Sequence, residues 1–306
     1  METQLKQDKI NVIIAINASY VLVAKRLINS LARLHKKNTV VVHVLFSNLS
    51  KEEKEIIQES SNGDIIVNCI PIDDSVVNIF PAIERFPQEV CLRLVAPFFL
   101  DLDKALYLDS DILLTKDIAD LYHINIDDYY AAVCKDKNSN NGAEFAHLKN
   151  LPFDEGNDYF NSGVMLLNFR KIRRDFNLND FSKFIEDNER FLKYPDQDIL
   201  NCMFAKKVFW LNEQLFNNQT HNSELPDFNN ASIIHYVGPS KPWDYKYRIG
   251  FSEMKTSRIS YTYFWHCLLE QKIVDHYEYA QFLTKRFFYR FKYFYTLIAA
   301  LLMKNG

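Results

Sequence analysis

The sequence predicts an α/β fold in which a parallel sheet is covered by helices. Short apolar runs alternate with amphipathic stretches along the N-terminal half of the chain, which is the pattern of consecutive βαβ units. The composition fits a large folded chain, with 306 residues, 48% hydrophobic and 25% charged residues, 5 Cys and a net charge of −3. These values disfavour a disordered chain, a disulfide-stapled mini-protein and a nucleic-acid-binding protein with a global basic field.

The boundaries of the elements are expected where the spacing of apolar residues changes between that of a strand and that of a helix. Strands are expected where β-branched and apolar residues run together, and helices where apolar residues recur three and four positions apart. Ser50 is a favourable N-cap, so the second helix is expected to begin directly after it. In chain order, the expected elements are strand Asn11–Ile16, helix Leu22–Leu34, strand Thr39–Phe46, helix Lys51–Glu59, and strands Asp64–Ile70 and Ala105–Leu108.

The first motif that carries chemistry is Asp109-Ser110-Asp111, between the strand Ala105–Leu108 and the apolar run Ile112–Leu114. Two carboxylates at the mouth of a parallel strand can hold a divalent cation that neutralises a diphosphate. The tripeptide alone is weak evidence, because the chain contains two other Asp-x-Asp matches. The alternative is a turn with solvated carboxylates.

A second motif begins at His235, directly after the apolar run Ala231–Ile234. An imidazole at a strand end would complete an oxygen-rich metal site, and mixed nitrogen and oxygen ligands favour Mn²⁺ over Mg²⁺. Gly238 would let the backbone approach a phosphate, and Lys241 would meet its charge. The alternative is a rigid turn of Gly and Pro residues with an incidental His.

Two further segments place polar residues at the ends of expected elements. Tyr159–Asn168 is an apolar strand whose polar entry contains Asn161, and a later helix begins with Asp196, Gln197 and Asp198. Asn161 and Gln197 have side chains that can orient sugar hydroxyls. Because acids in a first turn are favoured by the helix dipole whatever the function, capping is the alternative for Asp196 and Asp198.

Together these motifs resemble glycosyltransferase family 8, in particular its bacterial retaining α-galactosyl- and α-glucosyltransferases of lipooligosaccharide and lipopolysaccharide synthesis. The resemblance covers about residues 10 to 250. It implies a GT-A fold, with a Rossmann-like nucleotide-binding half, a mixed central sheet and a C-terminal helical tail. It also implies a hexosyltransferase that uses UDP-galactose or UDP-glucose and Mn²⁺, with Mg²⁺ as the alternative ion. The matching segments are Ala15–Tyr20, Arg93, Asp109-Ser110-Asp111, Tyr159–Asn168, Asp196–Leu200 and His235–Trp243.

The resemblance implies roles for individual residues. Asp109, Asp111 and His235 match the Mn²⁺ ligands of the family. Asn17 stands where the family commonly has Asp, and Ser19 where a larger amide is usual. Asn17 keeps a carbonyl acceptor for uracil but lacks the charge, so these two departures bear on the affinity for the nucleotide and not on the metal site. Tyr20 is positioned to stack on the uracil base. The matches to the donor site are Ala15, Asn17, Ser19 and Tyr20 for uridine, Arg93, Asn161, Asp196 and Gln197 for the sugar, Gly238 and Lys241 for the phosphates, and Ser110 as a further cofactor-binding residue.

The matched positions also imply a mechanism. Retention by double displacement needs a nucleophilic carboxylate, and the matching position here is Gln197, whose neutral amide is a poor nucleophile. We therefore expect front-side attack by the acceptor hydroxyl, with a UDP phosphate oxygen taking the proton. Asp196 would then orient sugar hydroxyls and Gln197 would lend electrostatic stabilisation. Phe80–Val90 and Pro239–Trp243 resemble loops that close over the donor.

The C-terminal residues differ in composition from the rest. The segment Thr284–Lys304 carries five Lys or Arg and no Asp or Glu. On a helix, Arg286 and Arg290 would flank an apolar face and Lys285 and Lys292 would lie nearly opposite it, which is typical of a helix lying on anionic lipid. The alternative is a helix that packs on the domain or on a second chain. The expected apolar face contains Ala280, Leu283, Phe287, Phe291, Phe294, Ile298 and Leu301.

These observations predict the domain organisation and the location. Residues 1–250 are expected to form the catalytic domain and residues 251–306 a membrane-association region. No export signal is visible, and the apolar run Phe294–Met303 is shorter than the ~20 residues of a membrane-spanning helix. We expect a cytoplasmic protein, peripheral on the inner face of the cytoplasmic membrane beside a lipid-linked oligosaccharide acceptor. A self-glucosylating protein like glycogenin and a non-catalytic nucleotide-sugar-binding protein are the alternatives.

Overall fold

The computed structural model describes residues 9–35, 38–61, 65–80, 87–139, 142–154, 156–204, 206–220, 225–244 and 253–285. The chain divides into two compact units. The first unit comprises residues 1–219 and 229–235, and the second comprises residues 220–228 and 236–306. The predicted boundary near residue 250, between a catalytic domain and a membrane-association region, stays a prediction.

A seven-stranded mixed sheet forms the centre of the first unit, in the order β3-β2-β1-β4-β7-β6-β8. The strand β7 is antiparallel to both of its neighbours, so a wholly parallel sheet, expected from the alternation alone, is wrong. A strand that is buried on both faces has the same apolar sequence in either direction. The mixed sheet implied by the family resemblance is present. The strands are β1 Lys9–Ala15, β2 Thr39–Phe46, β3 Ile65–Pro71, β4 Lys104–Leu108, β6 Ala131–Lys135, β7 Phe160–Asn168 and β8 Val208–Trp210.

The two predicted N-terminal helices are present as α1 (Val21–Leu34) and α2 (Lys51–Gln58). Ser50 caps α2 as expected, because its side chain accepts a hydrogen bond from the Glu53 N–H at 3.1 Å. The Glu53 carboxylate accepts one from the Ser50 N–H at 2.8 Å. This reciprocal capping box satisfies two N–H groups that a helix start leaves without intrahelical partners.

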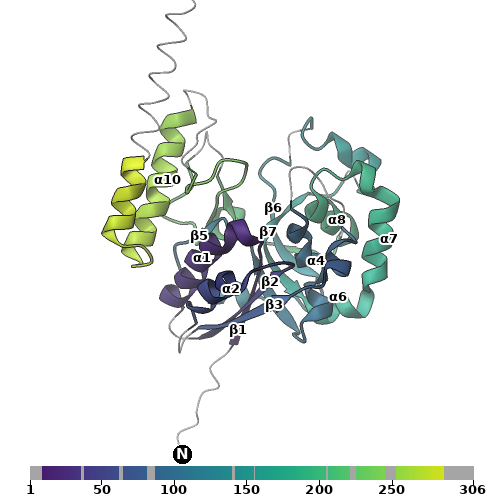
Figure 1. Ribbon diagram of the computed structural model, residues 1–306. Helices are drawn as coiled ribbons and strands as arrows, with labels where there is room; N and C mark the ends of the chain where they lie inside the picture. Colours follow the sequence, from purple (N-terminus) through teal and green to yellow (C-terminus); the bar gives the residue numbers. More distant parts are fainter. Residues whose placement is uncertain are drawn as a thin grey trace, which may run out of the picture. The chain divides into compact units, whose positions relative to one another are not determined.

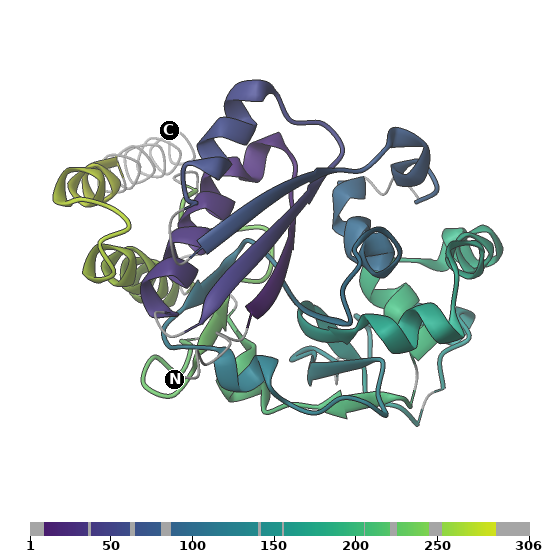
Figure 2. The same cartoon turned by 90° about the horizontal axis from the view of Figure 1, so that it is seen from below.

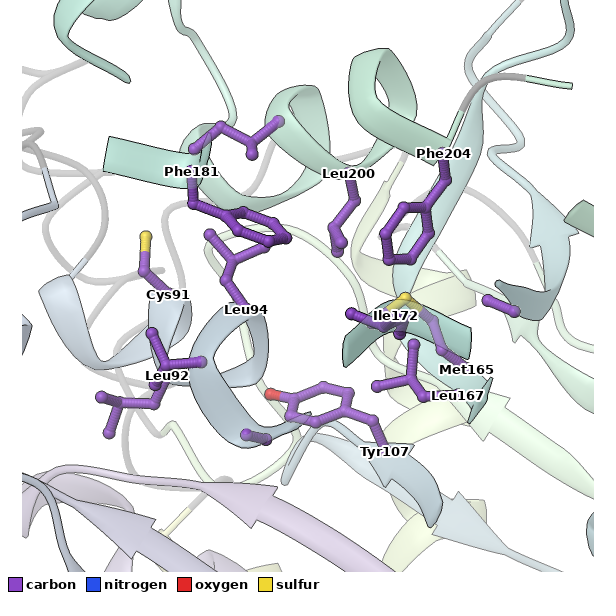
Figure 3. Packing of buried hydrophobic residues seen from close by; sticks show 14 of the residues in the cluster. Cys91, Leu92, Leu94, Tyr107, Met165, Leu167, Ile172, Phe181, Leu200 and Phe204 are labelled. Atoms are coloured by element: carbon purple, nitrogen blue, oxygen red, sulfur yellow. The ribbon is translucent and has the colours of Figure 1, made fainter. Parts of the chain in front are cut away.

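Helices cover both faces of this sheet, with α1 and α2 on one face and α4, α6, α7 and α8 on the other (Figures 1 and 2). The strand β4 contributes alternate residues to the two cores, Leu106 to the core with α1 and Tyr107 to the core with α4. Figure 3 shows Tyr107 in this second core with Leu94 from α4 and Phe181 from α7. The helices of this face are α4 Leu92–Phe99, α6 Phe169–Asp175, α7 Leu178–Asn188 and α8 Pro195–Phe204.

A smaller sheet of β5 (Ile112–Leu114), β10 (Ile233–His235) and β9 (Asn218–Gln219) completes the first unit. The strand β10 is antiparallel to β5 and parallel to β9. The register pairs His235 with Ile112, so the last residue of β10 lies beside the residue that follows Asp111. The first unit also contains short helices, α3 Asp74–Val77, α5 Ala119–Tyr122 and α9 Glu213–Phe216, and 3₁₀ turns at Ala18–Tyr20, Gln88–Cys91, Ala146–Asn150 and Glu189–Phe191.

The second unit contains α10 (Glu253–Glu270) and a further helical stretch at residues 276–285. Trp265 is buried and stacks on Phe282, with ring centroids 4.8 Å apart. Ala280 and Leu283, which belong to the expected apolar face, are exposed, and the rest of that face, from Phe287 onwards, lies outside the described residues. Among the helical segments that the structure describes, none combines the length and the apolar character that crossing a bilayer requires.

Candidate active site

Polar side chains gather at the edge of the large sheet where β1 and β4 end. Asp109 directly follows β4, and its N–H donates to the carbonyl oxygen of Gly163 on β7 at 2.8 Å. Since β1 and β4 are parallel neighbours, Ala15 at the end of β1 lies at the same edge. The carboxyl edge of parallel strands is where α/β proteins bind their ligands.

Three groups with metal-ligand chemistry meet at this edge. One ligand atom each from Asp109, Asp111 and His235 lies within 4.8 Å of the others. His235 Nε2 is 3.2 Å from Asp111 Oδ1 and 3.8 Å from Asp109 Oδ2. Ser110, between the two acids, is buried, and its hydroxyl has no hydrogen-bond partner within the described part of the chain. Two carboxylates and an imidazole form a donor set that suits Mn²⁺.

Gly163 allows these groups to come together. A Cβ atom at this position would lie 2.3 Å from His235 Cε1 and 2.7 Å from Asp109 Oδ2, well inside van der Waals contact. A glycine inside a strand often marks a place where another group approaches the backbone closely. The hollow above Gly163 is therefore occupied by two of the three candidate ligands, and this arrangement fits a divalent cation.

Arg93, on α4, connects the acids of two separate motifs. Its Nη2 is 2.7 Å from Asp109 Oδ1 and its Nη1 is 3.1 Å from Asp196 Oδ2. The same Nη1 donates to the carbonyl oxygen of Ser162 at 2.8 Å and to its hydroxyl at 3.0 Å. The guanidinium also lies over the ring of Tyr107, 4.3 Å from its centroid. Arg93 thus holds β7, β4 and the start of α8 in one arrangement.

Burial and the ion pairs shift the pKa values of these groups. Burial lowers the pKa of Arg93, but the carboxylates of Asp109 and Asp196 outweigh it and leave the pKa raised, so the guanidinium stays charged. Burial raises the pKa of Asp196, and Arg93 opposes part of this shift. Burial also raises the pKa of Tyr107, so its hydroxyl remains a neutral donor, 2.8 Å from Asp109 Oδ1.

The three polar residues at the start of α8 have different surroundings. Asp198 accepts hydrogen bonds from the N–H groups of Lys193 and Tyr194 at 2.8 and 2.9 Å, so for Asp198 the capping interpretation is correct. Asp196 instead faces Arg93 and accepts a hydrogen bond from the Ser162 hydroxyl at 2.7 Å. Gln197 Oε1 accepts one from the Ser162 N–H at 3.0 Å.

Asp136, Ser162 and Asn217 also belong to this edge, and the sequence reasoning missed all three. Asp136 follows β6, and its Oδ2 accepts from Gln197 Nε2 and Asn161 Nδ2, both at 3.3 Å. An acid directly after the apolar run of β6 is the signal that would have identified Asp136. Asn217, between α9 and β9, carries no comparable local signal.

The uridine-binding residues expected at the start of the chain form a compact turn. Asn17 Oδ1 accepts hydrogen bonds from the Ser19 N–H at 3.1 Å and from the Ser19 hydroxyl at 2.7 Å. The two positions that depart from the family pattern therefore bind each other. Tyr20, half-buried, immediately precedes α1, and its expected stacking on uracil stays a prediction.

The two residues expected to contact the phosphates, Gly238 and Lys241, belong to the second unit. Gly238 has a φ of 88°, a conformation that glycine adopts without strain. Lys241 Nζ donates to the carbonyl oxygen of Tyr236 at 2.7 Å. Their contacts with phosphates, and the closure of Pro239–Trp243 and Phe80–Val90 over a donor, stay predictions; residues 81–86 lie outside the described residues.

Comparisons with known proteins agree with this architecture. A lipopolysaccharide 1,2-glucosyltransferase of Escherichia coli is 29% identical over 253 residues, which span 78% of this chain and 74% of the relative. A putative glycosyltransferase of Haemophilus influenzae is 29% identical over 231 residues, 69% of this chain and 67% of the relative. The solved structure of the galactosyltransferase LgtC, in complex with donor and acceptor sugar analogues, matches with a TM-score of 0.67 at 22% identity, covering 82% of this chain and 95% of LgtC.

The likeness to LgtC confirms the expected GT-A fold. The family match reported next and the glucosyltransferase relative confirm the expectation of a hexosyltransferase. The family model "Glycosyl transferase family 8" matches residues 11–247, which is most of the chain and almost the whole range over which the motifs were recognised. The chain therefore belongs to glycosyltransferase family 8.

Proposed function

We propose that this enzyme transfers galactose or glucose from a UDP-sugar, with retention of configuration and with Mn²⁺, to a saccharide acceptor of lipooligosaccharide, lipopolysaccharide or a related cell-surface glycan. Membership of the family implies a nucleotide-sugar donor and a saccharide acceptor. The lipopolysaccharide acceptor is suggested by the activity named for the Escherichia coli relative. The hexose, the ion and the stereochemistry are our proposals.

The single observation that carries the proposal is the meeting of Asp109, Asp111 and His235 within 4.8 Å in the hollow above Gly163. A divalent cation held there would stabilise the negative charge that develops on the diphosphate when the sugar leaves. Asp196, fixed by Arg93 and Ser162, is the candidate to hold hydroxyls of the donor sugar. A carboxylate that is already oriented by a buried guanidinium loses little freedom when a sugar binds.

Front-side attack is supported by the hydrogen bonding of Gln197. Its Oε1 accepts from the Ser162 N–H and its Nε2 donates to Asp136, so both ends of the amide are already engaged. A neutral amide in this setting can lend a partial charge to an oxocarbenium-like transition state but does not form a stable covalent bond to the sugar. The acceptor hydroxyl then attacks from the face that UDP leaves, and a phosphate oxygen receives its proton.

We further propose that the enzyme lies in the cytoplasm on the inner face of the cytoplasmic membrane, held there by its basic and aromatic C-terminal residues. The sequence of Thr284–Lys304 motivates this proposal, and the exposure of Ala280 and Leu283 at the start of the expected apolar face is consistent with it. Such a placement would keep the active site close to a lipid-linked acceptor.

The deciding experiment is a hydrolysis screen with UDP-glucose, UDP-galactose and the two UDP-N-acetylhexosamines, each with Mn²⁺, with Mg²⁺ and with EDTA. We expect release of UDP from one UDP-hexose with Mn²⁺ and none with EDTA. Addition of truncated lipopolysaccharide should then shift the products from free sugar to an α-linked glycan, identified by the anomeric coupling in its NMR spectrum. A β-linked product would contradict retention, and activity that EDTA leaves unchanged would contradict the metal.

A further inference from the structure

Four buried side chains form a continuous hydrogen-bonded row behind the candidate metal ligands. It runs from Asp136 through Asn161 and Asn217 to His235, and each of these residues is at least nine-tenths buried. Asn161 Nδ2 donates to Asp136 Oδ2 at 3.3 Å, Asn217 Nδ2 donates to Asn161 Oδ1 at 3.0 Å, and Asn217 Oδ1 lies 3.0 Å from His235 Nδ1. Only His235 among them offers an atom to the metal site.

Two groups of fixed polarity determine the direction of this row at its Asn161 end. The Asp136 carboxylate can only accept, so Asn161 must turn its NH₂ group toward it. The backbone N–H of Gly163 can only donate, and it lies 3.0 Å from Asn161 Oδ1. Both constraints give the same orientation of the Asn161 amide, with its oxygen facing Asn217.

The polarity is passed from one amide to the next. Because Asn161 presents an oxygen, Asn217 must present its NH₂ group there and its own oxygen on the other side, toward His235. An imidazole nitrogen that faces a carbonyl oxygen carries the proton. His235 Nδ1 therefore bears the hydrogen, and the lone pair of the neutral ring lies on Nε2, the atom that faces Asp111 at 3.2 Å.

We propose that Asn217 is a positioning residue which fixes the Nδ1–H tautomer of His235 and so presents the Nε2 lone pair to a metal. This inference rests on the proposed metal site of Asp109, Asp111 and His235. A ligating histidine needs its second ring nitrogen to be held by an acceptor, and loss of such an acceptor typically weakens metal binding about 10- to 100-fold. Asn217 supplies that acceptor, and Asp136 and Asn161 keep Asn217 in the orientation that does so.

The test compares Asn217→Leu with Asn217→Asp. Leucine has a similar size and removes the acceptor, so the ring is released to place its proton on Nε2. Aspartate keeps an acceptor for Nδ1–H, and its second oxygen, which faces Asn161 Oδ1, is expected to carry a proton there because Asn161 presents an oxygen. Asn218→Leu is the matched control, because Asn218 is the next residue of the same segment and donates to the carbonyl oxygen of Gln214 instead.

Two measurements are made on each full-length protein. The first, without metal and at a pH at which the ¹⁵N shifts show a neutral ring, identifies the tautomer of His235 from the shifts of its ring nitrogens, assigned by loss of the signals in His235→Gln. The second is a titration with Mn²⁺ in the presence of UDP, followed by the EPR signal of the free ion. We expect Nδ1–H in the wild type, Asn217→Asp and Asn218→Leu, with Mn²⁺ affinities within about threefold of one another. Asn217→Leu should lose that tautomer and bind Mn²⁺ at least about 10-fold more weakly.

An Nε2–H tautomer in the wild type would overturn the proposal, and so would an Asn217→Leu protein with unchanged tautomer and affinity. If Asn217→Leu unfolds, as circular dichroism would show, Asn217→Ala removes the acceptor without adding bulk and is held to the same expectation. Failure of both the wild type and Asn218→Leu to bind Mn²⁺ would contradict the metal site itself, whereas the tautomer, measured without metal, still decides the role of Asn217.

Discussion

Arg93 Nη2 lies 2.7 Å from Asp109 Oδ1, so the first carboxylate of the Asp109-Ser110-Asp111 motif is already paired with a buried cation. The Tyr107 hydroxyl donates to the same oxygen at 2.8 Å. The two oxygens of Asp109 therefore have separate surroundings, because Oδ1 is held by the protein and Oδ2 faces His235. Rotation of the carboxylate would break two hydrogen bonds, so its metal-facing oxygen is fixed before any ion binds.

This arrangement predicts a large cost for removing the arginine. Arg93→Met leaves Asp196 buried without its cation, and breaking a buried pair typically costs about 3–5 kcal/mol. Urea denaturation should show this loss in the free energy of unfolding. Arg170→Met is the control, since the pair of Arg170 with Asp127 is exposed on both sides and exposed pairs contribute little. Equal stability of the two variants would contradict the role given to Arg93.

Gly163→Ala should separate the candidate metal ligands without changing any of them. The new Cβ would lie 2.3 Å from His235 Cε1 and 2.7 Å from Asp109 Oδ2, so both atoms must move away to reach normal contact. We expect Mn²⁺ affinity to fall at least about 10-fold, since ligand placement controls affinity. Gly142→Ala is a matched control, because a Cβ there would meet no atom within 4 Å. Mn²⁺ titrations of the two variants should differ clearly, and equal affinities would argue against the site.

Asp111 offers the cleanest test of the ligand set, because Asp109 also pairs with Arg93. Asp111→Asn should lower Mn²⁺-dependent transfer by more than about 100-fold, since it replaces an anionic ligand with a neutral one, and should leave the thermal unfolding temperature nearly unchanged. Asp101→Asn alters an exposed member of another Asp-x-Asp match and should behave as the wild type. Full activity of Asp111→Asn would remove Asp111 from the proposed ligands.

The sequence was informative wherever a local pattern carries the information. The bounds of β2 and the cap at Ser50 are as predicted. The polar residues after β4 and at the end of β10 were recognised because they directly follow apolar runs. Gly163 is a glycine inside a buried strand, a pattern that marks the close approach of another group to the backbone, but no role was predicted for it. Local pattern thus pointed to Asp109, Asp111, Asn161 and His235, whereas Arg93 was recognised only through the family resemblance.

The direction of β7 and the role of Asn217 could not be predicted from a local sequence pattern. An apolar strand buried on both faces has no sequence mark of its direction. Asn217 is one of many asparagines near a turn, and its role depends on contacts with Asn161 and His235, 56 and 18 residues away. Such contacts form only when β9, β7 and β10 assemble.

The basic C-terminal residues should govern membrane binding if the interfacial interpretation is correct. Arg286→Gln with Arg290→Gln removes two positive charges, each contributing about 1 kcal/mol near an anionic surface. Binding to vesicles that contain phosphatidylglycerol should weaken about 30-fold, and binding to neutral vesicles should change little. Lys51→Gln with Lys54→Gln removes the same charge from α2 and should leave vesicle binding unchanged. Equal losses in both double variants would indicate general electrostatic attraction instead.

Gln197→Glu tests the mechanism, because it supplies the carboxylate that double displacement would require. The introduced carboxylate would lie near Asp136 Oδ2, which is 3.3 Å from Gln197 Nε2, and repulsion between two buried carboxylates favours protonation of one of them. We therefore expect no covalent glycosyl-enzyme in intact-protein mass spectra recorded during turnover, and a loss of stability as the pH rises. A stable adduct on the wild type, at Asp136, Asp196 or Gln197, would contradict front-side attack. The absence of an adduct in both proteins, together with an α-linked product, would support it.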